Sequence, residues 1–211
     1  MIPLILRLKK NSHREIAKAQ DLVVETLYEI FDDAVFHGGT AIWRCYKGHR
    51  FSEDVDFYLK RDIKKIDQFY EALQKKGLLV ERKKISENSI YSTLKLGQTF
   101  VRFEAIFKKS KGKLHEYEKA EGSFITVYTL TPEELVKEKV ETYLNRLKVR
   151  DLYDIFFLLR HVEDNSDIKK DLNKLLKNFK RPVDEKELKV LITEGLVPNV
   201  EEMLTYIRRK A

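Results

Sequence analysis

The 211-residue sequence lacks several features that would place it in other classes of protein. It holds a single cysteine, Cys45, so it can form neither an intrachain disulfide nor a cysteine-based zinc site. Its longest apolar runs resemble "IFFLL" from Ile155, which is far too short to cross a bilayer. The opening "MIPLILRLKK" places apolar residues before charged ones, the reverse of a secretory signal. We therefore expect a cytoplasmic protein.

Charge, in contrast, is abundant. Lys and Arg number 41 against 34 Asp and Glu, and the formal net charge is +7. A basic chain favours a polyanionic partner such as a nucleic acid or a nucleotide. The stretch "KKSKGKLHEYEKAEG" from Lys108 is expected to be a lysine-rich loop, which either follows an RNA backbone or is only solvated.

The first half of the chain mixes helix and strand patterns. Apolar residues recur at helical spacing over 12–31 and 61–77, and a further helix is expected over 40–48, with Thr40 at its start and Gly48 at its end. Short apolar or alternating stretches predict strands. These strands are "AVFHGG" from Ala34, "DVDFYL" from Asp54, "LLVERKKI" from Leu78, "NSIYSTLKLG" from Asn88, "QTFVRFEAIF" from Gln98 and "SFITVYTL" from Ser123.

The second half is expected to be helical. Thr131, Pro132 and Glu134 form a strong helix start, with a capping threonine, a proline in the first turn and an acid at the third position. Helices are predicted at about 131–147, 149–162, 165–178, 184–194 and 198–210. The predicted organisation is an α+β domain over residues 1–128 and a helical domain over residues 129–211. A cleft between two such halves is a common place for a small-molecule site.

Three acidic residues point to a metal site. Asp54 and Asp56 are two positions apart in a predicted strand, so their side chains project from the same face. Glu104 is a lone acid in the otherwise apolar strand "TFVRFEAIF". If the two strands are neighbours, three carboxylates converge. Such a group suits Mg²⁺ or Mn²⁺, hard cations that take oxygen ligands.

A diglycine turn lies just before these acids. Gly38 and Gly39 allow a ligand to approach the backbone closely, and they lead into a predicted helix whose first N–H groups are unpaired. Such a helix start is a ready phosphate site. A plain strand-to-helix turn is the alternative. Together with the acids, the turn describes a nucleoside triphosphate held near metal ions for attack on phosphorus.

These residues resemble a known family. "HGGTAIWRCYKGHRFSEDVDF" is similar to the signature of the AbiEii/AbiGii (MenT-type) toxins, within the DNA polymerase β-like nucleotidyltransferase superfamily. "EKVETYLNRLKVRDLYDIFFLL" is similar to the family's second conserved region, and the two blocks run from about 36 to 159. The matching positions are Arg50, Ser52, Asp54, Asp56 and Phe57 in the first block and Lys139, Arg146, Arg150, Asp151 and Asp154 in the second.

The resemblance implies a polymerase β-like fold, with a short mixed sheet followed by helices. It implies transfer of a nucleotide from an NTP to an acceptor, for several members the 3′ end of tRNA, and a cognate antitoxin. Two positions depart from the family pattern: the third acid stands in "RFE" where a lysine often precedes it, and Thr142 replaces a usual alanine.

Roles follow from this resemblance. Asp54, Asp56 and Glu104 would hold metal, and Glu104 could accept a proton from the attacking hydroxyl. Lys139 and Arg150 would neutralise triphosphate charge. Arg50 would do the same or pair with Glu53. The expected catalytic residues are Asp54, Asp56, Glu104 and Lys139, and the expected nucleotide-binding residues are Gly38, Gly39, Thr40, Arg50, Ser52, Arg150, Asp151 and Asp154.

Alternatives remain for some of these residues and for the acceptor. Asp151 and Asp154, at i and i+3 on one helix face, could instead hold Arg146 and Arg150 in position. Ser52 could cap the turn into its strand. The acceptor could be a protein hydroxyl or a small molecule, or the chain could be a non-catalytic nucleotide- or RNA-binding module.

Overall fold

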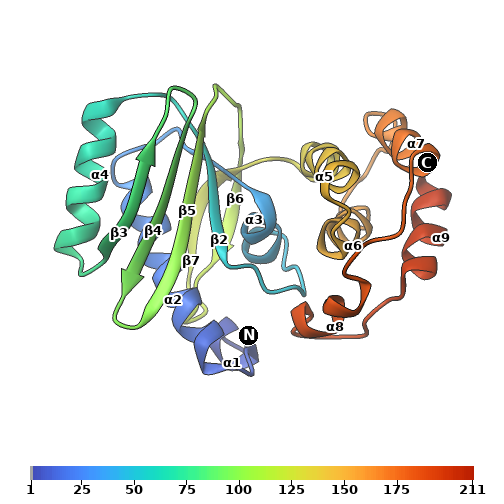
Figure 1. Cartoon of the computed structure of the whole chain (residues 1–211), viewed down its shortest axis with the longest axis horizontal. Helices are drawn as coiled ribbons and strands as arrows, with labels where there is room; N and C mark the ends of the chain where they lie inside the picture. The colour runs from blue at the N-terminus through green and yellow to red at the C-terminus, as the bar shows by residue number, and fades with distance from the viewer. Residues whose placement is uncertain (1) are drawn as a thin grey trace. The chain divides into compact units, whose positions relative to one another are not determined.

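The computed structural model describes residues 2–211, and these divide into two compact units (Figure 1). Unit 1 comprises the described residues up to Cys45 together with Phe51–Leu130. Unit 2 comprises Tyr46–Arg50 and Thr131–Ala211. The short segment Tyr46–Arg50, which falls within the AbiEii-like motif, therefore belongs to the helical unit although unit 1 surrounds it in the sequence.

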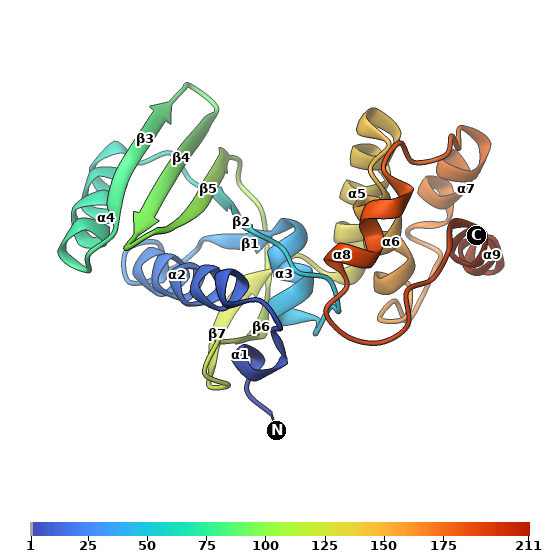
Figure 2. The same cartoon turned by 60° about the horizontal axis from the view of Figure 1, so that its bottom comes forward.

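Unit 1 is built on one mixed sheet. Within residues 2–211 the sheet has seven strands in the order β3-β4-β5-β2-β1-β7-β6. The pairs β1–β7 and β2–β5 are parallel, and all the others are antiparallel. Figure 2 shows β3, β4 and β5 side by side. The strands are β1 (Val35–His37), β2 (Asp54–Leu59), β3 (Leu79–Ile85), β4 (Ser89–Leu96), β5 (Thr99–Phe107), β6 (Lys113–Glu118) and β7 (Phe124–Thr129).

Two amphipathic helices cover one face of this sheet. Helices α2 (Asn11–Tyr28) and α4 (Ile63–Lys75) lie on the same side of β3, β4 and β5 (Figure 1). The rings of Phe69 on α4 and Phe103 on β5 pack with centroids 5.0 Å apart, and both side chains are buried. Because side chains alternate along a strand, the face opposite these helices carries Asp54 and Asp56 of β2. The apolar face is therefore used for folding, which leaves the polar face for a site.

Helix α3 (Gly38–Cys45) directly follows β1 and is anchored by a buried charge. Its Arg44 is 1% exposed, forms an ion pair with Asp21 of α2 and donates from Nε to the Glu118 carbonyl at 2.7 Å. The Tyr117 hydroxyl also donates to Asp21, at 2.9 Å. Burial raises the pKa of Asp21, and the Arg44 guanidinium opposes that rise. These contacts fix α3 against α2 and β6, so the position of its first turn is well determined.

Two expectations for unit 1 differ from the structure, and one element was not expected. The helix expected over 40–48 begins earlier, at Gly38, and ends at Cys45. The lysine-rich stretch expected as a loop contains strand β6, whose exposed Leu114 and Lys113 give a weak alternation because it is an edge strand. A short helix, α1 (Leu4–Arg7), precedes α2, and its buried Leu4 packs in a small cluster with Trp43.

Unit 2 contains the helices that follow residue 130. Helix α5 begins as expected with a complete capping box between Thr131 and Glu134, and α9 has a second one between Asn199 and Glu202. The stretch expected as a helix over 184–194 is instead a 3₁₀ turn, Glu185–Glu187, followed by a short helix. The helices are α5 (Pro132–Arg146), α6 (Val149–Leu158), α7 (Lys169–Lys177), α8 (Leu188–Leu191) and α9 (Val200–Lys210).

Candidate active site

The predicted carboxylates lie on neighbouring strands of unit 1. Strands β2 and β5 are parallel and adjacent, and their register pairs Asp56 with Glu104 and Asp54 with Arg102. Paired residues on adjacent strands project from the same face with Cβ atoms about 5 Å apart. Val55 and Phe57, between and after the two aspartates, are fully buried on the other face. The sheet thus presents Asp54, Asp56 and Glu104 together.

Arg102 neutralises one of these acids. Its guanidinium forms a two-pronged ion pair with Asp54, from Nε to Oδ1 at 2.6 Å and from Nη2 to Oδ2 at 2.8 Å. This geometry satisfies both carboxylate oxygens. Alternation along "TFVRFEAIF" places Arg102 on the same face as Glu104, but the sequence alone indicates no role for it. The available signal was its position two residues before Glu104, where the family often has a lysine.

Glu104 has no such partner: within residues 2–211 its side chain forms neither a hydrogen bond nor an ion pair. Burial raises the pKa of the Glu104 carboxyl, and the negative charges of Asp56 and Asp54 raise it further. Arg102 and His37 act in the opposite direction. A carboxylate with a raised pKa is a better proton acceptor than an ordinary one. The electrostatics of the three acids are therefore coupled, as close neighbours must be.

The first glycine of the diglycine turn lies against Asp56. Gly38 has φ +76°, a left-handed conformation that favours glycine, and a Cβ there would lie 2.9 Å from the Asp56 Cγ and closer still to Oδ2. The start of α3 and the Asp56 carboxylate are therefore in direct contact. Thr40, completely buried, donates its hydroxyl to the Asp54 carbonyl oxygen. Thr40 thus ties α3 to β2, and its hydroxyl is already used within the protein.

The three acids have the donor atoms that a divalent cation prefers, but they are not arranged as a group that could hold one. Carboxylate oxygens are the ligands that Mg²⁺ and Mn²⁺ prefer, and the space that a Cβ at Gly38 would fill lies beside one of them. Within residues 2–211, however, no three His, Cys, Asp or Glu side chains form a group that could hold a metal ion. Asp54 is already paired with Arg102, so a cation bound there would take the place of that guanidinium. The oxygen donors of Asp54, Asp56 and Glu104 fit a hard cation in their chemistry.

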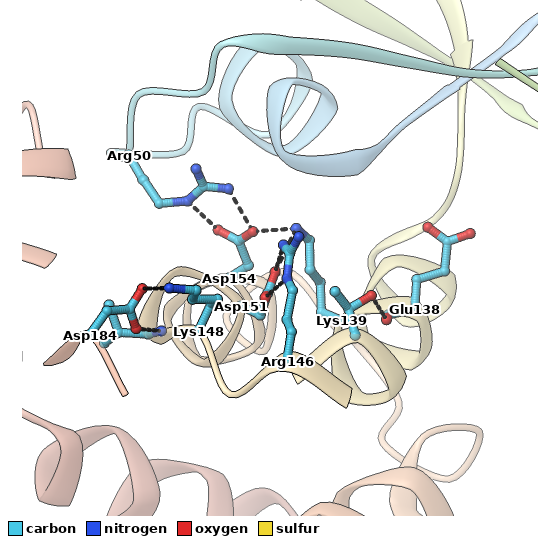
Figure 3. Close-up of polar contacts among 10 residues, drawn as sticks. Arg50, Glu138, Lys139, Arg146, Lys148, Asp151, Asp154 and Asp184 are labelled. Atoms are coloured by element: carbon cyan, nitrogen blue, oxygen red, sulfur yellow. Dashed lines mark hydrogen bonds and ion pairs between the residues drawn. The ribbon is translucent and has the colours of Figure 1, made fainter. Parts of the chain in front are cut away.

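A second cluster, in unit 2, brings together residues from the other conserved block. Asp154 lies between two cations (Figure 3): it accepts from Arg50 Nε at 2.8 Å and Nη2 at 2.7 Å, and from Lys139 Nζ at 2.7 Å. Asp154 and Arg50 are 1% and 5% exposed. Burial alone would raise the pKa of Asp154, but Arg50 and Lys139 outweigh it and lower that pKa. Asp154 is therefore a buried partner of Arg50.

Asp151 extends this network on the same helix. It is fully buried and accepts from Arg146 Nε at 2.7 Å and Nη2 at 2.8 Å, and Lys139 lies 3.3 Å away (Figure 3). Lys139, only 7% exposed, thus bridges both aspartates. The two acids hold Arg146, as the structural alternative expects, but the other cations they hold are Lys139 and Arg50.

Two predicted nucleotide-binding residues lie outside these networks. Within residues 2–211 the Arg150 side chain forms no ion pair or hydrogen bond, in contrast to Arg146, one turn earlier in the sequence. Ser52 is buried in unit 1, and its carbonyl accepts from Gln20 Nε2 at 2.9 Å. Arg150 is therefore a cation still available to an anion, while Ser52 takes part in the packing of α2 against the approach to β2.

Residues 22–205 match the family described as nucleotidyl transferase AbiEii toxin, Type IV TA system. The chain belongs to this family of nucleotidyltransferase toxins. An antitoxin partner and a nucleotide substrate go with that membership.

Solved structures share the fold. MenT4, a nucleotidyltransferase toxin from Mycobacterium tuberculosis, is 17% identical, with a TM-score of 0.66 over 94% of this chain and 82% of that one. JHP933 from Helicobacter pylori is 21% identical, with a TM-score of 0.64 over 95% and 92% of the two chains. These similarities confirm the α+β nucleotidyltransferase fold that the sequence predicts. No curated protein sequence matches the chain significantly.

The helices of residues 2–211 were compared with the length and apolar character of membrane-spanning helices. None of them combines the length and the apolar character that crossing a bilayer requires.

Proposed function

We propose that this protein transfers a nucleotide from an NTP to the 3′ end of tRNA in a reaction that depends on Mg²⁺ or Mn²⁺. The observation that carries the proposal is the pairing of Asp56 with Glu104 on parallel strands, beside the Gly38 turn that opens α3. Acids held this close repel one another and need a cation. The net charge of +7 favours RNA as the acceptor.

Asp54, Asp56 and Glu104 are the residues that would hold the metal. Bound there, the ion would neutralise phosphate charge and favour ionisation of an attacking hydroxyl. Arg102 serves meanwhile as the counter-ion of Asp54, at 2.6 Å. Arg102 keeps the Asp54 carboxylate ionised and oriented, so that a metal ion could replace the guanidinium.

Glu104 is the proposed proton acceptor. The acceptor's hydroxyl oxygen attacks the α-phosphorus, and the bond from phosphorus to the departing pyrophosphate breaks. The hydroxyl proton passes to Glu104, whose raised pKa suits this role. Gly38, Gly39 and the first N–H groups of α3 receive phosphate oxygens, and the buried Thr40 hydroxyl holds this turn against β2.

The roles of the unit 2 residues on the nucleotide remain predictions. Arg150 is the cation in the conserved block that has no protein partner within residues 2–211, so it can bind triphosphate without breaking an ion pair. Lys139 and Arg50 are held by Asp154, and Asp151 supports Lys139. The predicted role of Lys139 in catalysis would require it to exchange at least one of its carboxylate partners.

The test is transfer of label from each NTP, radiolabelled at the α-phosphate, to total tRNA with and without Mg²⁺. Label in RNA, lost on adding EDTA, is expected. Asp56→Asn and Glu104→Gln should lower the rate by about 10²- to 10⁴-fold. Glu116→Gln, which alters an exposed acid on edge strand β6, is the matched control and should act like the unmodified protein.

Other acceptors give different results in the same assay. Label in protein or in a small molecule would overturn tRNA as the acceptor but retain the transferase chemistry. Absence of transfer to any acceptor, with nucleotide binding intact, would identify a binding module and overturn the proposal.

A further inference from the structure

The carboxylate face of the sheet continues beyond the acids onto β4 and β3. The pairing of residues on adjacent strands forms two rows that run across β2, β5, β4 and β3. One row runs from Asp56 through Glu104 and Tyr91 to Lys84, and the other runs from Asp54 through Arg102 and Thr93 to Arg82. Helices α2 and α4 cover the opposite face, so within unit 1 these rows lie on the face without them (Figure 1).

The outer part of this face is basic. Arg82 and Lys84 are exposed, and within residues 2–211 the side chain of neither forms an ion pair or hydrogen bond. Their neighbour Lys83 differs: it projects toward α4, lies 3.5 Å from Asp67 and sits over the Tyr70 ring at 4.4 Å. The alternation of the strand thus places two free cations on the carboxylate face and one satisfied cation on the other.

One aromatic ring lies between these cations and the acids, and a second lies farther along the same face. Tyr91 is the register partner of both Glu104 and Lys84, and it is 37% exposed. On the next row Phe100 is 52% exposed, with Lys95 Nζ 5.4 Å from its ring centroid. Exposed aromatic rings on an open sheet are accessible for stacking with bases.

We propose that this face, formed by Tyr91, Lys84 and Arg82, binds the unpaired 3′ end of the acceptor RNA. This inference rests on the proposed function and specifies where the acceptor strand lies. Bases stack on exposed aromatic rings whatever their sequence, and basic side chains follow the backbone. An open sheet with stacking aromatics is also the platform that RNA-recognition domains use.

The dimensions and the charge pattern favour a single strand. Adjacent strands lie about 4.8 Å apart, so Asp56 and Lys84, three strands apart in one row, are separated by roughly 14 Å. That length accommodates a few nucleotides, each of which adds at least about 3.4 Å, the rise of a stacked strand. A terminal nucleotide near Glu104 can therefore have its neighbour on Tyr91 and its preceding phosphates on Lys84 and Arg82. A duplex offers no free base face to Tyr91.

Binding of a fluorescent single-stranded RNA with the 3′ sequence of tRNA tests this inference directly. Tyr91→Ala should weaken binding by about 5- to 100-fold, as loss of one stacked base does, and Tyr91→Phe should retain it. Lys84→Ala and Arg82→Ala should each weaken binding and lower the slope of log affinity against log salt by about 0.7. Lys83→Ala, with the same loss of charge on the other face, should leave affinity and slope unchanged.

Two controls separate this inference from the proposed function. NTP binding should be the same in all four alanine variants, because none of the altered side chains is among the residues proposed to bind the metal ion or the triphosphate of the NTP. If the unmodified protein labels tRNA while Tyr91→Ala and Lys84→Ala bind RNA normally, the location of the acceptor is wrong and the proposed function stands. If RNA binding depends on Tyr91 but no nucleotide is transferred, the proposed function is wrong and the binding face stands. Equal affinity for duplex and single strand would also overturn the inference.

Discussion

The two units each contain a cluster of acidic side chains, and the clusters differ in how their charge is balanced. In unit 2, Asp151 and Asp154 are buried and accept from three cations, Arg50, Lys139 and Arg146. In unit 1, Asp54 has Arg102 as its partner, while Glu104 is partly exposed and forms no ion pair within residues 2–211. Asp54, Asp56 and the unit 2 cluster lie in the two blocks that resemble the family, and Glu104 lies between those blocks in the sequence.

The two ways of balancing charge favour different proposed roles. A buried carboxylate with several ion partners has its charge and hydrogen bonds satisfied inside the protein, and it stabilises one arrangement of its helices. A carboxylate whose pKa is raised by its neighbours is destabilised in its ionised form and gains when a cation arrives. The unit 1 acids therefore suit a metal ion, and the unit 2 acids suit the positioning of basic residues.

The largest expected effect concerns the buried acids of unit 2, Asp151 and Asp154. Asp154→Asn removes the negative charge between Arg50 and Lys139, so the charges of these two buried cations are no longer balanced at that position. Breaking such a pair lowers the free energy of unfolding by about 3–5 kcal/mol. Urea denaturation measures it. Glu141→Gln, at an exposed ion pair with Lys174, is the control, with an expected loss of about 0–1 kcal/mol. Equal losses for the two variants would mean that the buried cluster has no special structural role.

Replacement of Gly38 tests how closely the start of α3 packs against Asp56, one of the unit 1 acids. Gly38→Ala forces a positive φ on a non-glycine residue and drives a Cβ into Asp56, so transfer activity should fall by about 10²-fold from misplacement of the carboxylate. Gly97→Ala is matched to it: φ is also positive, at +59°, but no heavy atom lies within 4 Å of the added Cβ. It should lose stability and keep its activity. Similar activity losses in both variants would contradict a specific contact with Asp56.

Arg102 gives Asp54 in unit 1 an ion-pair partner, as the basic residues of unit 2 do for Asp151 and Asp154. Arg102→Gln frees Asp54, so Mn²⁺ should bind more tightly, by up to about fivefold, the value of a partly exposed ion pair. Calorimetric titration of Mn²⁺ measures this change. Arg82→Gln removes a charge from the same face without touching Asp54 and should alter Mn²⁺ affinity much less. Weaker Mn²⁺ binding in Arg102→Gln would show that Arg102 supports the metal site instead of competing with it.

The smallest expected effect is the pH dependence of stability caused by Glu104. The folded protein holds this proton more tightly than the unfolded chain, because the pKa is raised from 4.5. Its contribution to stability is therefore present below the pKa of an unfolded glutamate and is lost as the pH rises through the folded value. Glu104→Gln should raise the Tm at pH 7 by at most about 2 °C, since solvent screens a partly exposed group.

Thermal melts at pH 7 and near pH 4 measure this effect, and the difference should vanish at the lower pH. Glu116→Gln on edge strand β6 should change the Tm at neither pH. A lower Tm for Glu104→Gln at pH 7 would mean that Glu104 is stabilised by a favourable contact, as the unit 2 acids are.

Local patterns determined much of this protein. Alternation in "DVDF" and "FVRFEAIF" is sufficient to place Asp54, Asp56 and Glu104 on polar faces, because side chains on a strand must alternate. The capping residues Thr131 and Glu134 set the start of α5 for an equally local reason. Patterns failed where elements are short or lie at an edge: β6 was expected as a loop, and the residues after Asp184 were expected as one long helix. In both places few apolar residues are buried, so the periodicity is weak.

Only the tertiary structure decided which charges meet. The pairs Arg102–Asp54 and Arg50–Asp154 join residues 48 and 104 positions apart, and no local rule sets such a partner. The sequence by itself determined the residue types, their faces and the family. Strand register and helix packing then decided that the unit 2 acids are neutralised by buried cations, whereas Glu104 in unit 1 has no ion pair within residues 2–211. Ion pairing depends on distances that only the folded chain defines.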